Sequence, residues 1–243
     1  MYLLILGAGS DIARETAKLF SSREGANCYL AGRDLDALGL LATDLEIRYL
    51  VKPSVVYFDA TDFDSHKAFY ESLSPSPDGV LLAFGLLGVQ RACEEDFHEA
   101  RRVYETNFTG AASILEIVAR DFERKGRGFL IAISSVAGVR GRKANYIYGA
   151  AKAALTEYLS GLRQRLHSRG VHVMTVLPGY VRTRMTGRMD LPDKLVATPE
   201  EVAGDIYSGW KSGRNVIYTK WFWPYIMIII RHLPEFIFKR ISI

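Results

Sequence analysis

The chain has 243 residues, of which 49% are hydrophobic and 24% charged, and a formal net charge of +4. This length fits one α/β domain with a sizeable core, the composition is that of a soluble globular protein, and the weak charge without a basic block argues against a nucleic-acid partner. Cys28 and Cys93 are the only cysteines, too few for a disulfide framework or a zinc site, so we expect no metal and a cytoplasmic location, where thiols stay reduced.

Short apolar runs alternate with longer segments of helical periodicity. We predict strands at residues 2–6, 27–31, 54–58, 80–84, 129–134, 171–177 and 215–219, and helices at residues 11–22, 34–48, 62–73, 94–125, 146–168 and 199–212. Strands without polar alternation are typically buried on both faces. The alternation therefore predicts a single Rossmann-type, doubly wound α/β domain. It has a seven-stranded parallel sheet, helices on both faces and a ligand crevice at the carboxyl ends of the strands.

The first strand is followed by Gly7-Ala-Gly-Ser-Asp-Ile-Ala13, a glycine turn that opens a helix. Backbone N–H groups and the helix dipole at such a turn suit a pyrophosphate. Ile12 replaces the third glycine of the G-x-G-x-x-G pattern, and the Asp11 carboxylate would lie close to a bound phosphate. A purely structural turn therefore stays an alternative.

The second predicted strand ends at Gly32-Arg33-Asp34, roughly 20 residues beyond the glycine turn. An acidic residue here marks the ribose 2′-hydroxyl of NAD, whereas an arginine suits the 2′-phosphate of NADP. Arg33 favours NADP(H), while Asp34 keeps NAD(H) possible. The structural alternative is that Arg33 is a solvated loop charge.

Tyr148 and Lys152 are four residues apart and share one face of the helix predicted at residues 146–168. Tyr146 is six residues from Lys152 and does not lie on that face. A nearby ammonium lowers the pKa of a phenol from about 10, so we predict a Tyr148 pKa shifted toward useful general-acid range. Taken alone, such a pair more often serves packing and solubility. Ser135, at the carboxyl end of a predicted strand, and Asn107, in the long helical region before it, make the pattern more specific.

These four residues in this order, with the Pro178-Gly179 turn, resemble the short-chain dehydrogenase/reductase family over essentially the whole chain. The resemblance implies that Tyr148 protonates a carbonyl oxygen and that Lys152 lowers its pKa and holds the nicotinamide ribose. It implies that Ser135 binds the substrate oxygen and that Asn107 positions a water.

The resemblance also implies that residues 1–220 form an NAD(P)-binding reductase domain, with Ser134 a structural neighbour and Tyr146 a pocket wall. The implied cofactor contacts are Gly7, Gly9, Ser10, Asp11, Ile12, Arg33, Asp59, Ala60, Ala83, Gly85, Tyr148, Lys152, Pro178, Gly179, Val181 and Thr183. Leu82-Ala-Phe-Gly85 stands where the family has Asn-Asn-Ala-Gly, so two polar anchors are replaced. A cofactor-binding protein without turnover, acting through a partner, is therefore an alternative.

Residues 221–243 form an aromatic and basic tail, which we assign to the same domain. Its aromatic residues lead an apolar run, and cations follow: Trp221, Phe222, Trp223 and Tyr225, then Arg231, His232, Lys239 and Arg240. This pattern suits an interfacial segment near anionic lipid. Alternatively, the tail packs over the substrate loop or a dimer partner. Further cations near the catalytic helix either attract a substrate phosphate or are surface charges: Arg140, Arg142, Lys143, Arg182 and Arg184.

Residues 83–88, 142–149, 178–185 and 230–240 further resemble the reductases of polyprenylphosphoryl 2-keto-pentoses, a subgroup that works with an epimerase partner. This implies a lipid-linked keto-sugar substrate and a peripheral position at the inner face of the membrane. The family resemblance also implies a homodimer or homotetramer paired through the helices at residues 94–125 and 146–168. The alternative substrate is an ordinary small ketone or a 3-oxoacyl thioester.

Overall fold

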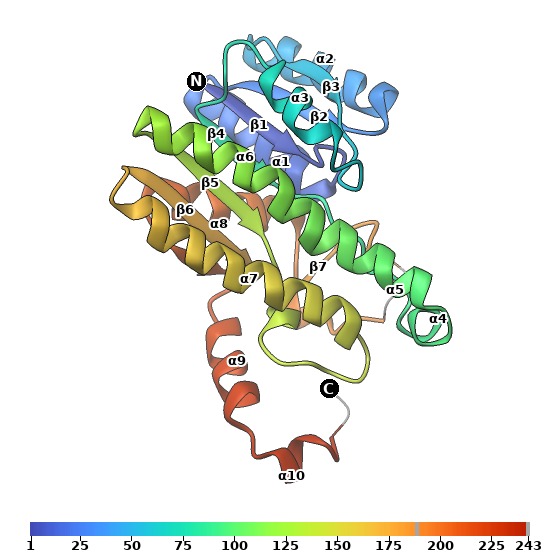
Figure 1. Ribbon diagram of the computed structural model, residues 1–243. Coiled ribbons are helices and arrows are strands. Elements are labelled where there is room, and N and C mark those ends of the chain that lie inside the picture. Colours follow the sequence, from blue (N-terminus) through green and yellow to red (C-terminus); the bar gives the residue numbers. More distant parts are fainter. Residues whose placement is uncertain (188–189, 242–243) are drawn as a thin grey trace.

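The computed structural model describes residues 1–187 and 190–241 and contains one seven-stranded parallel sheet in the order β3-β2-β1-β4-β5-β6-β9 (Figure 1). The strands are β1 (Tyr2–Leu6), β2 (Asn27–Gly32), β3 (Ser54–Tyr57), β4 (Gly79–Leu82), β5 (Gly128–Ile133), β6 (Val171–Leu177) and β9 (Val216–Tyr218). The predicted fold class is confirmed. Strand order reverses between β1 and β4, and this point positions the ligand crevice of such a sheet.

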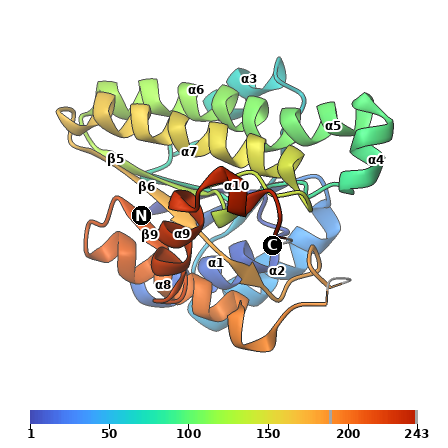
Figure 2. The ribbon, with the colours of Figure 1, turned by 90° about the horizontal axis from the view of Figure 1, so that it is seen from below.

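Helices cover both faces of the sheet (Figure 2). One layer holds α3 (Ser65–Glu71), α6 (Gly110–Lys125) and α7 (Tyr146–His167), and the other holds α1 (Asp11–Glu24), α2 (Leu35–Tyr49) and α8 (Pro199–Lys211). Alternate residues of β1 enter the two cores: Leu3 and Ile5 pack toward α1, whereas Leu4 and Leu6 pack toward α6. All four are fully buried, which explains why this strand is apolar throughout.

The helix predicted at residues 94–125 is wrong in its continuity. It is divided into α4 (Gln90–Glu95), α5 (Phe97–Tyr104), a π-helical turn (Glu105–Thr109) and α6. Asp96 has an extended backbone, and its carboxylate accepts a bond from the His98 N–H at 2.8 Å, which starts α5 anew. Asn107 Nδ2 donates to the Val103 carbonyl at 2.8 Å, so a side chain takes the acceptor that an α-helix reserves for the backbone.

The C-terminal part folds as two short helices, α9 (Trp223–His232) and α10 (Glu235–Phe238), beyond the sheet (Figure 1). Neither these helices nor the small sheet of β7 (Tyr180–Val181) and β8 (Val196–Ala197) was predicted from the sequence. Trp223, Met227 and Ile230 are buried in a cluster with Val136 and Leu177. Among the described residues, no helix combines the length and apolar character needed to cross a membrane.

Arg140 fastens these helices to the loop before α7. Its guanidinium donates to the carbonyls of Ile230 at 2.7 Å and Leu233 at 2.6 Å, pairs with Glu235 at 2.7 Å, and lies 3.7 Å from the Phe238 ring centroid. This arginine, considered above as a phosphate ligand, is thus engaged in holding the C-terminal segment.

Candidate active site

The turn between β1 and α1 lies very close to the backbone of the chain that follows β4. Gly7 has φ +83°, and a Cβ there would come within 2.5 Å of the Phe84 backbone nitrogen. Ser10 caps α1 by accepting a bond from the Ala13 N–H at 3.2 Å. Because α1 begins directly after β1, the unpaired N–H groups of its first turn lie at the carboxyl end of the sheet. There they can donate hydrogen bonds to an anion.

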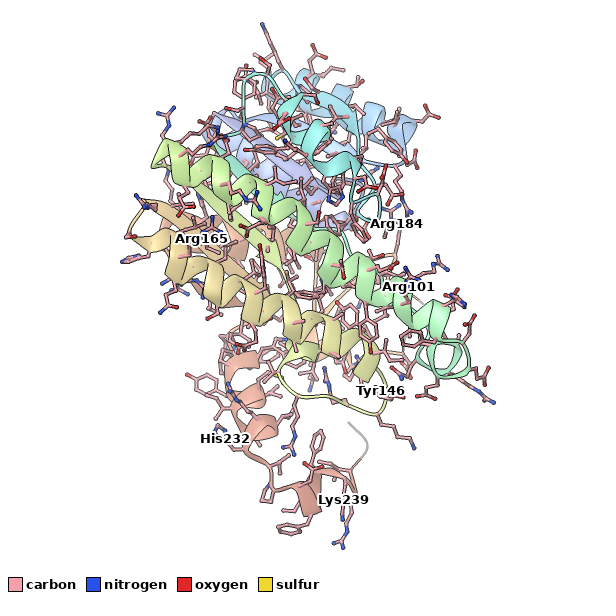
Figure 3. The ribbon with its side chains drawn as sticks, in the orientation of Figure 1. Arg101, Tyr146, Arg165, Arg184, His232 and Lys239 are labelled. Atoms are coloured by element: carbon pink, nitrogen blue, oxygen red, sulfur yellow. The ribbon has the colours of Figure 1, made fainter. Side chains whose placement is uncertain are left out.

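Asp11 at this turn is paired with Arg184. Arg184, which is labelled in Figure 3, follows β7. The Arg184 backbone N–H donates to one Asp11 carboxylate oxygen at 2.8 Å, and its Nε lies 3.1 Å from the other. The same guanidinium donates to the Gly9 carbonyl. The Asp11 carboxylate, which was predicted to lie close to a bound phosphate, is therefore neutralised by Arg184. This arginine belongs to residues 178–187, which we call the substrate-side loop.

A cavity over the carboxyl ends of β1, β2 and β4 gathers predicted residues of the adenosine end. It is bordered by Gly7, Gly9, Ser10, Arg33, Asp59, Ala60, Ala83 and Gly85. Arg33 lies 4.0 Å from the Asp59 carboxylate and has a largely exposed side chain. Arg14, which was not predicted from the sequence, borders the same cavity one turn into α1, and its buried Nε has no partner among the described residues.

Three of the four predicted catalytic residues line an adjoining cavity of about 330 Å³, together with Ser10, Asp11, Ile12, Ala83 and Gly85. Ser135, Tyr148 and Lys152 all border it. Lys152 is 3% exposed, its Nζ donates to the Ile133 carbonyl at 3.0 Å, and it lies 5.8 Å from the Tyr148 ring centroid. Ser134 instead binds the Lys152 carbonyl at 2.9 Å inside the contact with α7.

The predicted direction of the Tyr148 pKa shift is wrong for this structure. Burial raises the pKa of Tyr148 to about 12, which the interaction with the Ser135 hydroxyl only partly offsets. Burial also lowers the pKa of Lys152 from 10.5 to about 8. Both shifts have one cause, since the low-polarity environment penalises the phenolate and the ammonium alike. At neutral pH the pair therefore consists of a neutral phenol beside a protonated lysine.

Asn107 lies behind the cavity wall and is 1% exposed. Its Oδ1 accepts from the Leu86 N–H at 3.2 Å, and its Nδ2 donates to the Leu86 carbonyl at 2.7 Å as well as to Val103. The amide thus clamps the chain after β4 to the π-helical turn. This clamp supports the segment in which Leu82 and Ala83 replace the polar residues of the family pattern.

The substrate end contains the remaining predicted residues, since Pro178, Gly179, Val181 and Thr183 border the catalytic cavity. The Trp223 ring of α9 packs on Gly179 so closely that a Cβ there would lie 1.9 Å from the ring.

The structure changes the interpretation of Tyr146 and excludes the surface-charge alternative for Arg142, which is buried. Tyr146, predicted as a pocket wall, is 45% exposed at the start of α7 and does not border the cavity (Figure 3). Arg142 and Asn145 do border it. Asn145 carried no signal in the sequence, because its amide matters only through its position in the folded loop.

The arrangement suits the reduction or oxidation of a carbonyl–alcohol pair. A phenol and a serine hydroxyl face one cavity, where they can hold an oxygen and exchange a proton with it. The glycine turn and four arginines, Arg14 and Arg33 among them, border the neighbouring cavity, which fits a phosphorylated nucleotide. The buried Arg14 Nε is an unused donor at that end. These residues fit a nicotinamide dinucleotide lying across both cavities.

Comparison with known proteins agrees with this chemistry. A sequence profile described as short chain dehydrogenase matches residues 2–193. An uncharacterized oxidoreductase of Mycobacterium tuberculosis is 36% identical over 241 residues (98% of this chain and 96% of the relative), and one of Streptomyces coelicolor is 36% identical over 251 residues (99% and 96%). A short-chain dehydrogenase of Sphingobium yanoikuyae, solved in complex with NADPH, superposes with a TM-score of 0.84 at 24% identity, covering 99% of this chain and 96% of its own. The chain therefore belongs to the short-chain dehydrogenase family and is an oxidoreductase.

Proposed function

We propose that the protein reduces a carbonyl group to an alcohol with NADPH, while NADH remains a possible donor. The observation that carries the proposal is the convergence of Ser135, Tyr148 and Lys152 on one cavity. The neighbouring cavity, bordered by Arg14 and Arg33, supports the choice of NADPH. The NADPH bound by the Sphingobium relative supports the same choice.

In the proposed reaction, a nicotinamide dinucleotide held across the two cavities would provide the hydride for the carbonyl carbon. Tyr148 donates its phenolic proton to the carbonyl oxygen, so one O–H bond breaks and the alcohol O–H bond forms. Ser135 donates a hydrogen bond to the same oxygen. The Lys152 ammonium stabilises the phenolate that remains, because an adjacent positive charge favours the anion in a buried site.

For the substrate we propose a polyprenylphosphoryl 2-keto-pentose, as in the epimerisation of decaprenylphosphoryl-ribose. Support comes from the C-terminal segment, where Trp221, Tyr225 and Ile229 are 80%, 64% and 64% exposed. His232 and Lys239 project from the same segment away from the sheet (Figure 3). An apolar surface with flanking cations suits an enzyme that meets its substrate at an anionic membrane.

The assembly proposals follow from the same resemblance. We place the enzyme in the cytoplasm, peripherally at the inner face of the membrane and beside an epimerase partner. Pairing of two or four copies through α6 and the neighbouring α7 makes the homodimer or homotetramer. The division into residues 1–220 and a tail within the same domain stays a prediction.

Replacing Tyr148 with Phe tests the proposed chemistry. We expect the rate of NADPH oxidation with a ketone panel to fall about 100- to 10,000-fold, because the proton donor is lost while the ring remains. NADPH binding, followed by fluorescence, should change little. NADPH and NADH are assayed in parallel.

The matched control is Tyr146→Phe, which removes a hydroxyl from the exposed start of the same helix. It should retain full activity. Undiminished turnover in Tyr148→Phe would contradict the assigned acid. Cofactor binding without turnover on any ketone in the wild-type protein would favour a non-catalytic role.

A further inference from the structure

Arg142 is a buried cation at the wall of the catalytic cavity. It lies in the loop between the 3₁₀ turn Val136–Gly138 and α7, and it is 8% exposed. Among residues 1–187 and 190–241, its Nε is fully covered and has no hydrogen-bond partner. Burial of a charge is unfavourable unless a counter-charge or hydrogen bonds compensate for it. Arg142 is therefore a buried cation that a bound anion could compensate.

The neighbouring cations differ from Arg142 in this respect. Arg140 is engaged by the carbonyls and the carboxylate of the C-terminal segment, and Lys143 is exposed to solvent. Arg184 is paired with Asp11, the one carboxylate among the described lining residues of the cavity. No acidic side chain of that lining therefore remains to neutralise Arg142.

Asn145 adds a second unused polar group beside Arg142. Its backbone N–H donates to the Arg142 carbonyl at 3.0 Å, so the two residues are held one turn apart in the loop. Its Oδ1 is buried without a partner among the described residues, and it borders the same cavity. Because the amide oxygen and nitrogen are interchangeable by rotation, this side chain can also present its NH₂ group to a ligand.

We propose that Arg142 and Asn145 form a subsite for an oxyanion, a phosphate ester or a carboxylate, carried by the ketone substrate. The inference rests on the proposed function and deepens it. The carbonyl is held at Ser135 and Tyr148, and the anion is held at Arg142 and Asn145, which border the same cavity.

A planar guanidinium suits two oxygens of one anion. Arg142 does not border the adenosine cavity, where Arg33 is the predicted contact of the 2′-phosphate. Apolar residues line the same cavity and suit the body of the substrate: Leu87, Val136, Tyr180, Val181 and Met185.

The test compares Arg142→Gln with Lys143→Gln, which removes an exposed positive charge next door. Substrates are benzoylpropionate and its neutral methyl ester. Arg142→Gln should lower kcat/KM for the acid about 10- to 100-fold, the effect of losing a hydrogen-bonded charge pair, and change the ester less than about threefold. Lys143→Gln should change neither. Equal losses for acid and ester, or no loss for the acid, would overturn the subsite for carboxylates.

A binding measurement keeps this inference separate from the proposed reaction. Farnesyl phosphate and farnesol are titrated calorimetrically into the NADP⁺-saturated protein. We expect the phosphate to bind the wild type about tenfold or more tightly than Arg142→Gln, with Arg142→Lys between them, and farnesol to bind all three alike. Phosphate binding that is indifferent to Arg142 would refute the subsite for lipid phosphates, whereas the acid–ester comparison decides for carboxylates. If no ketone is reduced but this dependence holds, the proposed reaction fails and the subsite stands.

Discussion

Lys152 and Tyr148 illustrate how burial shapes the chemistry of single residues. Packing an ammonium among apolar groups lowers its pKa to about 8, and the same environment raises the phenol pKa to about 12. The lysine is still charged at neutral pH, which the reaction needs, but the charge is maintained against an unfavourable environment. Such a group supports activity at a cost in stability.

Replacing Lys152 with Met should therefore stabilise the protein while removing its reductase activity. The folded-state pKa of Lys152 is lower than its unfolded value of 10.5, so the folded chain binds fewer protons between pH 8 and 10.5. The penalty for the buried charge, at most about 3 kcal/mol, is present in full below pH 8 and is lost as pH rises to about 10.5.

Urea unfolding of both proteins at several pH values measures this difference. We expect the gain in the free energy of unfolding of Lys152→Met over wild type to be largest near pH 7 and to shrink steadily above pH 8. Ser22→Ala, an exposed substitution far from the cavity, controls for general effects. A Lys152→Met protein less stable than wild type at pH 7 would show that the charge is stabilising in place.

At the scale of elements, the site is assembled by contacts between segments that lie far apart in sequence. Arg184 joins the loop after β7 to the glycine turn through Asp11. Trp223 joins α9 to the same loop through Gly179. The substrate-side loop is thus held at one end by an ion pair and at the other by an aromatic ring.

Replacing Asp11 with Asn should lower the KM for NADPH about three- to tenfold. The substitution removes a negative charge near the predicted pyrophosphate and releases Arg184 to approach it, so both effects favour the dinucleotide. Initial rates at low and high salt measure the change, which should be smaller at high salt because of screening.

Glu46→Gln is the control, because it removes the same charge from an exposed position near the other end of α2, at a residue that borders neither cavity. An Asp11→Asn variant with a raised KM for NADPH would mean that the ion pair holds the loop in its binding position.

At the scale of the whole molecule, the exposed apolar surface is concentrated on the C-terminal segment. A triple variant, Trp221→Ser with Tyr225→Ser and Ile229→Ser, should lose about tenfold or more in binding to phosphatidylglycerol vesicles, because the apolar contact with lipid is removed. Reduction of neutral small ketones should persist, since Trp223 is unchanged. Co-sedimentation and ketone turnover measure the two properties.

Leu40→Ser with Ile47→Ser removes comparable exposed apolar side chains from α2 and serves as the control. Equal vesicle binding by wild type and triple variant would exclude this surface as the membrane contact. Deleting residues 221–243 is a poorer test, because it also removes the ring that packs on Gly179.

Much of the sheet was predictable from sequence because the strands are continuous apolar runs, and Ser135, Tyr148 and Lys152 were predictable because their spacing places them on shared edges and faces. The break at Asn107 was not, since it depends on where one side chain finds a carbonyl. The pKa of Tyr148 was predicted in the wrong direction because spacing reveals the neighbouring charge but not the depth of burial.

The π-helical turn at residues 105–109 has a further consequence for the spacing of the chain. The one additional residue in this turn rotates the residues that follow by about 100° around the helix axis. The buried residues of α5 and those of α6 therefore do not follow one continuous α-helical period. Deleting a single residue there would rotate Ile114, Val118 and Phe122 out of the sheet interface. A sequence alignment that omits this additional residue would shift the register of α6 by one position. It would then assign the wrong residues of α6 to the sheet interface.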